Sequence, residues 1–342
     1  MVGLFAFFAA FLLYPIWLTV QGGFEGRDGG FTMHHILTVF NDPVLLDGFL
    51  NALGIAVGTT LVCIIIALPL ATLAARYTFP FKGVFSALVL VPLILPPFVG
   101  AIGLHHLLGK YGAINTLLVD MGLFSEGYDF IGNGGFWAIV FIEALHLYPI
   151  LYLNATAALA NLDPALEEAA ENMGATPWQR FRQIILPLIR PGLFAGATIV
   201  FIWSFTELGT PLMFDYQVVT PVQIFNGIKE MNTSQEPYAL TAVMLFAAIT
   251  FYLLGKMVFG GRAYAMYSKA SVQSSLEKLT GFRGWFAMGA FTTVIGLAVL
   301  PHISVLFTSL AVEGSWYKSV LPTSWTPDHF EGALSHELAV GS

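Results

Sequence analysis

The sequence predicts an all-α protein that crosses a lipid bilayer about seven times as a helical bundle. Of its 342 residues, 56% are hydrophobic and only 10% are charged, whereas soluble domains carry about 25% charged residues. The mean hydropathy of +0.75 agrees with a membrane protein. Seven apolar runs are long enough to span the hydrocarbon core, and they lie near residues 3–20, 50–74, 84–108, 135–159, 193–213, 238–260 and 284–310.

Charge and cysteine content exclude several other classes. The net charge of -7 comes mostly from acidic residues in the connecting segments, so it gives no reason to expect nucleic acid as a partner. Cys63 is the single cysteine and lies in an apolar run, and neither a C-x-x-C nor a His/Cys zinc spacing occurs. We therefore expect no disulfide within the chain, no metal site and no cofactor.

The first run, at residues 3–20, could be mistaken for a secretory signal. It lacks a basic n-region and a small-residue cleavage site, and it is long enough to cross a bilayer, so we predict a first span. The third run contains Pro92, Pro96 and Pro97. Prolines free backbone groups that need partners in protein or in a wet cavity, so this span is expected to face the interior of the bundle.

The distribution of basic residues predicts the orientation of the chain. With the N-terminus in the cytoplasm, the inside segments hold ten of the 14 Lys and Arg residues, and the outside segments hold four. The positive-inside bias therefore places the N-terminus and the 161–191 segment in the cytoplasm of a multi-pass inner-membrane protein. The inside residues are Arg76, Lys82, Arg180, Arg182, Arg190, Lys256, Arg262, Lys269, Lys278 and Arg283, and the outside residues are Arg27, Lys110, Lys229 and Lys318.

The polar 161–191 segment begins with a short amphipathic helix. Asp163 is a good N-cap, and Pro164 suits the first helical position. Apolar residues then recur at helical spacing, namely Leu166, Ala169, Ala170 and Met173. Gly174 can adopt the left-handed conformation that ends a helix.

A second short helix follows the glycine, so the segment is predicted to form a helical hairpin, called here the 161–191 hairpin. Thr176, Pro177 and Gln179 supply an N-cap, a first-turn proline and the glutamine of a capping box. Trp178, Phe181 and Ile185 would share a face, while Arg180 and Arg182 project elsewhere. The prolines at positions 187 and 191 are expected to end the helix. A solvated loop between two spans is the simpler alternative, and the two consecutive caps argue against it.

An internal repeat suggests a second module. An apolar span with Pro15 is followed by a polar stretch and then by Phe31-Thr32-Met33-His34-His35; an apolar span with Pro301 is followed by a polar stretch and then by Trp325-Thr326-Pro327-Asp328-His329. The predicted layout is one six-span module at 1–281 and the start of a second module, with one span and a periplasmic segment, at 282–342. A seven-span subunit with a periplasmic tail is the alternative.

Ionisable residues within predicted spans are costly, so they are candidates for a translocation pathway. Glu143 and His146 lie on one helical face, and Glu207 is followed by glycine and proline as if at a broken helix end. His105 and His106 end the third run. A structural Glu143–His146 pair and an interfacial histidine are the alternatives.

No motif for catalysis or nucleotide binding occurs. G-x-x-x-x-G-K-[ST], H-E-x-x-H and G-x-S-x-G are all absent. We therefore predict a protein that is not an enzyme and whose energy for transport comes from another chain.

The 161–191 hairpin resembles the EAA loop of permease subunits of binding-protein-dependent ABC importers. The residues that carry the resemblance are Glu168, Ala169, Ala170, Gly174, Ile184, Leu186 and Pro187. The resemblance implies that the hairpin docks in a groove of a cytoplasmic ATP-binding subunit. In such a contact, Gly174 would set the angle between the two short helices. The small side chains of Ala169 and Ala170 would permit close approach, and Glu168 would pair with a cation across the interface. It further implies a periplasmic or extracellular substrate-binding protein, a second permease half, fused or supplied by a second copy, and surrounding membrane lipid.

The wider layout, with the segments LYPILYLNATAALANLDPALEEAA and SFTELGTPLMF, is similar to the fused two-module ferric iron permeases, which implies iron as the solute. Thiamine and aminoethylphosphonate permeases share that layout and stay open as alternatives. An ion-coupled secondary transporter or channel using Glu143 and Glu207 would not need the capped hairpin. An intramembrane enzyme would need a constellation of reactive groups that the sequence lacks.

Overall fold

The predicted all-α polytopic fold is confirmed. A computed structural model describes residues 1–26, 28–131, 135–228, 234–259 and 277–335. Among these residues, six helices are long and apolar enough to cross a membrane, and one bent helix pair supplies a seventh candidate span. Four residues used to predict the orientation lie outside the described part of the chain, namely Arg27, Lys229, Arg262 and Lys269.

The chain divides into two compact units. Unit 1 is Met1–Leu61 with Asn161–Ser271, and unit 2 is Val62–Ala160 with Val272–Ser342. The long helix α4 (Pro43–Arg76) contributes to both. Each unit combines two segments that are separate in the sequence. The modules of the predicted repeat, in contrast, are continuous stretches of sequence, so units and modules are different divisions of the chain.

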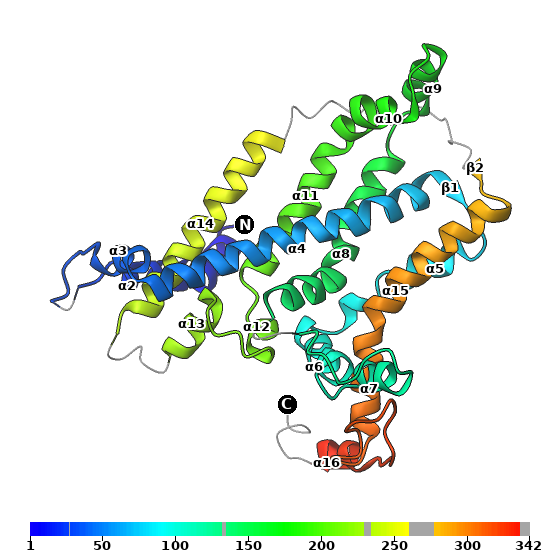
Figure 1. Ribbon diagram of the computed structural model, residues 1–342. Coiled ribbons are helices and arrows are strands. Elements are labelled where there is room, and N and C mark those ends of the chain that lie inside the picture. Colours follow the sequence, from blue (N-terminus) through cyan, green and yellow to red (C-terminus); the bar gives the residue numbers. More distant parts are fainter. Residues whose placement is uncertain (27, 132–134, 229–233, 260–276, 336–342) are drawn as a thin grey trace. The chain divides into compact units, whose positions relative to one another are not determined.

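Unit 1 is built around α14, which packs against α2, α11 and α13 (Figure 1). The packing on α2 is close, since a Cβ placed on Gly23 would lie 3.1 Å from Ala239 Cα. Phe205, Ala52, Ala56 and Met244 form one buried cluster of this unit. Its elements are α1 (Val2–Phe8), the π-helix η1 (Ala9–Leu13), α2 (Tyr14–Gly23), α3 (His34–Asn41), α9 (Pro164–Asn172), α10 (Pro177–Arg180), the π-helix η3 (Phe181–Ile185), α11 (Leu186–Phe205), α12 (Gly209–Met213), α13 (Thr220–Gly227) and α14 (Glu236–Phe259).

Unit 2 is built around α15, which runs alongside α6. The two backbones approach closely because Gly103 has no side chain: a Cβ there would collide with Pro301 O. Ser304 Oγ donates a hydrogen bond to Gly103 O at 3.0 Å. The elements are β1 (Tyr77–Thr78), α5 (Lys82–Leu88), the 3-10 helix η2 (Val91–Ile94), α6 (Pro97–Leu108), α7 (Ala113–Asp120), α8 (Phe136–Ala160), β2 (Glu277–Lys278), α15 (Gly281–Leu310) and α16 (Asp328–Ser335).

The third apolar run forms two helical stretches, Lys82–Ile94 and Pro97–Asp120, that meet at an angle of 94°. Pro96 between them is extended, with φ -61° and ψ 151°, since a residue that precedes a proline avoids the helical region. Pro92 and Pro97 are buried within unit 2, while Pro96 is exposed.

Each unit contains a corner of the same design. After α2, Glu25 and Phe31 form an isolated antiparallel β-bridge, and the Thr32 amide donates to Phe24 O at 2.8 Å. After α15, Ala311 and Trp325 form the same kind of bridge, and the Thr326 amide donates to Leu310 O at 2.8 Å. In each corner the threonine hydroxyl accepts the amide hydrogen bond that starts the next helix, from His34 and Asp328 respectively, both at 3.1 Å.

A short parallel pair joins β1 to β2, with Tyr77 opposite Glu277 and Thr78 opposite Lys278. The Leu279 amide extends the pairing by donating to Thr78 O at 2.9 Å. This pair lies at one end of α15, and α16 lies at the other end (Figure 1). The two ends of this span therefore carry different structures.

Candidate functional site

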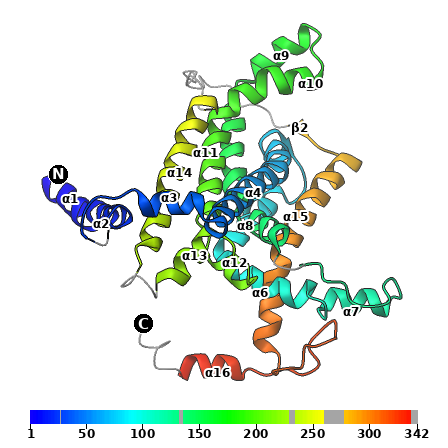
Figure 2. The same cartoon turned by 60° about the vertical axis from the view of Figure 1, so that its left-hand side comes forward.

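The 161–191 hairpin projects beyond the end of α11, at the opposite end of that helix from α12 (Figures 1 and 2). Its first helix, α9, starts as predicted. Asp163 caps it, with its Oδ1 accepting a hydrogen bond from the Ala165 amide at 2.9 Å, and Pro164 occupies the first turn. Both features satisfy or remove amide donors that the first turn of a helix leaves without partners.

Gly174 forms the turn between the two short helices in the left-handed conformation, with φ +84°. The Gly174 amide donates to Glu171 O at 2.8 Å, and the Ala175 amide donates to Ala170 O at 3.0 Å. A Cβ placed on Gly174 would meet nothing within 4 Å. The constraint at this position is therefore the backbone conformation, which residues with a side chain rarely adopt, and not a lack of space.

The second short helix, α10, begins with the predicted capping box. The Thr176 amide donates to Gln179 Oε1 at 2.7 Å, and the Gln179 amide donates to Thr176 Oγ1 at 3.3 Å. Across the turn, Arg180 Nη1 and Glu171 Oε2 form an ion pair. Exposed pairs of this kind contribute only about 0.2–1 kcal/mol, so the pair adds little to the stability of the fold.

The expectation that Pro187 and Pro191 end this helix is wrong. The helix continues without a break from Pro177 to Phe205, through 29 residues. The π-helical turn η3 widens the helix, since the Leu186 amide donates to Phe181 O. Leu186 and Pro187 follow this π-turn directly, and Pro191 lies inside α11.

The seven motif residues fall into three environments. Glu168, Ala169 and Gly174 are exposed, and Ala170 is buried. Ile184, Leu186 and Pro187 are half-buried on the continuous helix.

The hairpin also exposes large apolar side chains. Leu166, Met173 and Trp178 are 48%, 82% and 66% exposed, and the Trp178 ring stacks on Phe181 with centroids 5.7 Å apart. Exposed apolar side chains therefore lie on both short helices of the hairpin and at the turn between them.

Glu207 stands at the helix end that the sequence predicted. The helix α11 ends at Phe205 and α12 starts at Gly209. Glu207 Oε1 accepts hydrogen bonds from the Gly209 amide at 3.1 Å and from the Thr210 amide at 3.2 Å. The carboxylate therefore caps α12 within unit 1.

Glu143 and His146 lie on α8 in unit 2, and both are buried, with exposures of 0% and 4%. Their predicted common face is thus the packed side of α8. His146 hydrogen-bonds to the backbone of Pro92, which belongs to η2, and His302 on α15 is close enough to interact with it electrostatically. His105 and His106 occupy the last turn of α6 as expected, and His106 stacks on Trp316 with centroids 5.4 Å apart.

Sequence reasoning missed two contributions to these sites. His302 joins His146 from a helix distant in the sequence, and the signal was available, because His302 is an ionisable residue within an apolar run. The Glu171–Arg180 pair could not be read from spacing alone, because it depends on the turn at Gly174. Among the described residues, no three His, Cys, Asp or Glu side chains group as metal ligands would.

Comparisons with known proteins agree with this geometry. A model of the family described as "binding-protein-dependent transport system inner membrane component" matches residues 67–264. The ferric transport system permease protein of Actinobacillus pleuropneumoniae is 28% identical over 299 residues, which are 86% of this chain and 40% of that protein. The chain therefore spans less than half the length of that ferric relative.

Two further similarities involve other solutes. The spermidine/putrescine transport system permease protein of Haemophilus influenzae is 30% identical over 203 residues, covering 58% of this chain and 70% of that protein. A crystal structure of a bacterial alginate ABC transporter in complex with an alginate pentasaccharide-bound periplasmic protein has a chain that is 19% identical to this one. The TM-score is 0.56, with 75% of this chain and 91% of that chain covered. This last similarity supports the fold alone.

Proposed function

This chain belongs to the family of binding-protein-dependent transport system inner membrane components, and we propose that it forms the translocation part of an ATP-driven importer. The relatives named above are transport system permease proteins, and the helices of this chain are suited to a multi-pass position in the membrane. In the proposed orientation the N-terminus and the 161–191 hairpin are cytoplasmic, as the basic residues favour. ATP would be hydrolysed by separate subunits.

The observation that carries the proposal is the exposed apolar surface of the 161–191 hairpin. Met173, Trp178 and Leu166 project from two short helices that are joined through Gly174 and linked by the Glu171–Arg180 pair. An apolar helix face of this kind fits a hydrophobic groove of a partner. We propose that the groove belongs to the ATP-binding subunit, with Glu168 and Ala169 at the contact.

The continuous helix offers a direct mechanical link from that contact into the membrane. A 29-residue helix is about 43 Å long at 1.5 Å per residue. Movement of the hairpin by the closing ATPase would therefore move the far end of α11, where Glu207 caps α12. Ile184, Leu186 and Pro187 lie on this helix between the docking surface and the span.

We further propose that residues 1–281 and 282–342 belong to successive permease modules. The matching threonine corners after α2 and α15 support this, as does the equal spacing of Pro15 from Phe24 and of Pro301 from Leu310. A pathway would then need the remaining part of a second module, or a second permease chain.

Ferric iron is the proposed solute, delivered by an external binding protein. The ferric relative aligns with 86% of this chain, whereas the polyamine relative aligns with 58%. Glu143, His146 and Glu207 are the proposed pathway residues. Uptake into vesicles that contain the complete transporter, measured with radioactive iron, thiamine and aminoethylphosphonate in turn, tests the choice of solute. Uptake that needs an ion gradient and not ATP would favour the secondary transporter.

The docking proposal is tested by cross-linking. Met173→Cys and Trp178→Cys, introduced into the complete protein, should each cross-link to the co-expressed ATP-binding subunit. Met121→Cys, at an exposed methionine of unit 2 that follows α7, is the matched control and should not. Equal cross-linking at all three positions, or cross-linking only at Met121, would contradict docking through the hairpin.

A further inference from the structure

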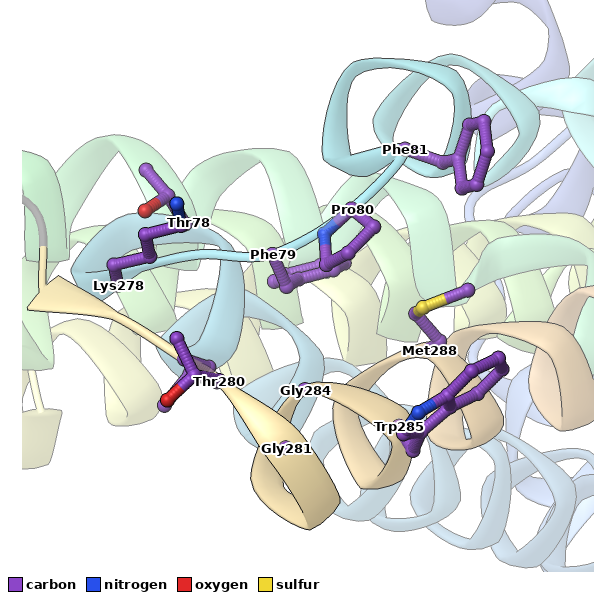
Figure 3. A pocket seen from close by; sticks show the side chains of 11 residues that line it. Thr78, Phe79, Pro80, Phe81, Lys278, Thr280, Gly281, Gly284, Trp285 and Met288 are labelled. Carbon is purple, nitrogen blue, oxygen red and sulfur yellow. The ribbon is translucent and has the colours of Figure 1, made fainter.

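An apolar groove of about 560 Å³ lies beside the β1–β2 pair in unit 2. One wall is the loop after β1, with Phe79, Pro80 and Phe81, and the other is the first turns of α15, with Trp285 and Met288 (Figure 3). Phe81 and Trp285 are largely exposed. The groove is therefore open to the surroundings of the span and is not part of a closed core.

The groove has a polar end and an apolar end. Figure 3 shows Lys278 and Thr78 near each other at one end, while Trp285 and Met288 lie together at the other. Thr280 adds a second hydroxyl on the polar side. An amphiphile with a charged head and an apolar tail matches this gradient.

A second groove, of about 490 Å³, shares Leu279 with the first. Its walls include Phe282 and Phe286 on α15, and both Arg283 and Glu277 line it. Two neighbouring apolar grooves, each with a cation, suit the two acyl chains and the anionic head of one phospholipid.

The surrounding charge is strongly positive. Four basic residues lie at the ends of β1, α5 and α15 or next to them, namely Arg76, Lys82, Lys278 and Arg283. Glu277 of β2 is the one acidic residue among the described residues of these segments. Lys82 Nζ donates to Tyr77 O at 2.8 Å.

We propose that these paired grooves bind an anionic phospholipid, with its phosphate at Lys278 and Arg283 and one acyl chain in each groove. The site lies on the side proposed to be cytoplasmic, where spans end, and Trp285 has the interfacial character that such a level favours. Basic pockets between spans on that side recognise anionic headgroups. The proposal adds a lipid partner and does not depend on which solute is carried.

Trp285 serves as a probe for the test. The complete protein is reconstituted in vesicles that contain either brominated phosphatidylglycerol or brominated phosphatidylcholine, since bromine quenches nearby tryptophan fluorescence. The signal of Trp285 is obtained as the difference between the native protein and Trp285→Phe. Each cation near an anionic lipid contributes about a fivefold preference, so quenching of Trp285 should require several-fold less of the brominated anionic lipid than of the neutral one.

Three variants make the result specific. Lys278→Gln with Arg283→Gln should abolish the preference, whereas Lys278→Arg with Arg283→Lys should keep it and shows that the fold tolerates changes here. Lys256→Gln removes an exposed cation at the end of α14 and should leave the preference unchanged. Equal quenching by the two lipids in the native protein, or a preference that survives the double glutamine variant, would overturn the proposal. Loss of the preference in Lys256→Gln would also overturn it, since the effect would then follow overall charge.

Discussion

Replacing Gly174 by valine and by asparagine separates the conformation of the hairpin turn from its volume. Gly174 has φ +84°, and a Cβ there meets nothing within 4 Å. Asparagine and valine both fit the open space. Asparagine, however, visits the left-handed conformation readily, and a β-branched residue does not.

The size of the effect follows from the backbone alone. The left-handed conformation costs an ordinary residue about 1–2 kcal/mol, which reduces the population of the native turn roughly 5- to 30-fold relative to its alternatives. The spans do not depend on this turn, so membrane insertion should be unchanged. Gly174→Val should therefore retain ATP hydrolysis by the assembled transporter while solute uptake per ATP falls several-fold, and Gly174→Asn should stay within about twofold of the native protein.

The assay measures ATP hydrolysis and uptake in the same vesicles. Gly83→Ala is the matched control, because Gly83 is a helical glycine with open space and no left-handed φ, and alanine is favourable in a helix. Equal coupling in the valine and asparagine variants would show that the conformation of Gly174 does not transmit the ATPase movement, and the reasoning from φ would be refuted.

Three further predictions concern the same continuous helix. Thr176→Ala removes the cap and should cost about 1 kcal/mol of local helix stability, seen as faster hydrogen exchange at Gln179, while Thr176→Ser should restore it. Glu207→Gln keeps an acceptor for the Gly209 and Thr210 amides, whereas Glu207→Leu leaves both without that acceptor. The leucine variant should therefore lose about 1–3 kcal/mol and melt at a lower temperature in detergent, and equal melting would argue against the cap. Ile184→Gly with Leu186→Gly should lower uptake more than the corresponding double alanine variant, because glycine costs about 1 kcal/mol per helical residue. Both variants should still co-purify with the ATP-binding subunit, and equal uptake would contradict transmission through the helix.

The caps of the hairpin could be predicted because they depend on neighbouring residues only. Asp163 with Pro164, Thr176 with Gln179, and the glycine between them each satisfy local backbone groups. The seven apolar runs likewise reflect a property that short windows of sequence contain, namely the length needed to cross hydrocarbon.

The failures arose where a proline has two possible outcomes. Pro187 was expected to end a helix, but the helix continues through it after the π-turn at Phe181–Ile185. Pro97 has the opposite outcome, since the extended Pro96 before it produces a sharp break. Which outcome occurs depends on the turn that precedes the proline, and proline content alone does not specify that turn.

Contacts between segments that are distant in the sequence could not be predicted, for a different reason. His302 and His146 are brought together by the packing of α15 in unit 2, which in turn depends on the absence of a side chain at Gly103 and on the hydrogen bond from Ser304. The sequence also could not show that Ala170 is buried while its neighbour Ala169 is exposed. The apolar pattern of this short helix has only four residues, and it does not decide which of two adjacent alanines faces the rest of the protein.

The continuity of the helix through Pro187 changes how the 161–191 hairpin can work. A helix that ended at Pro187 would leave a flexible joint between the docking surface and the membrane, and movement of the ATPase would be lost in that joint. In the proposed coupling, a helix that continues to Phe205 would transmit a tilt along its whole length: about 5° over roughly 43 Å displaces the far end by about 4 Å. Glu207 holds the first amides of α12 at that far end, so the displacement reaches a helix start within the membrane region. The continuous helix, with the π-turn at Phe181–Ile185 directly before Leu186 and Pro187, is therefore the element proposed to carry force from the docking surface to α12.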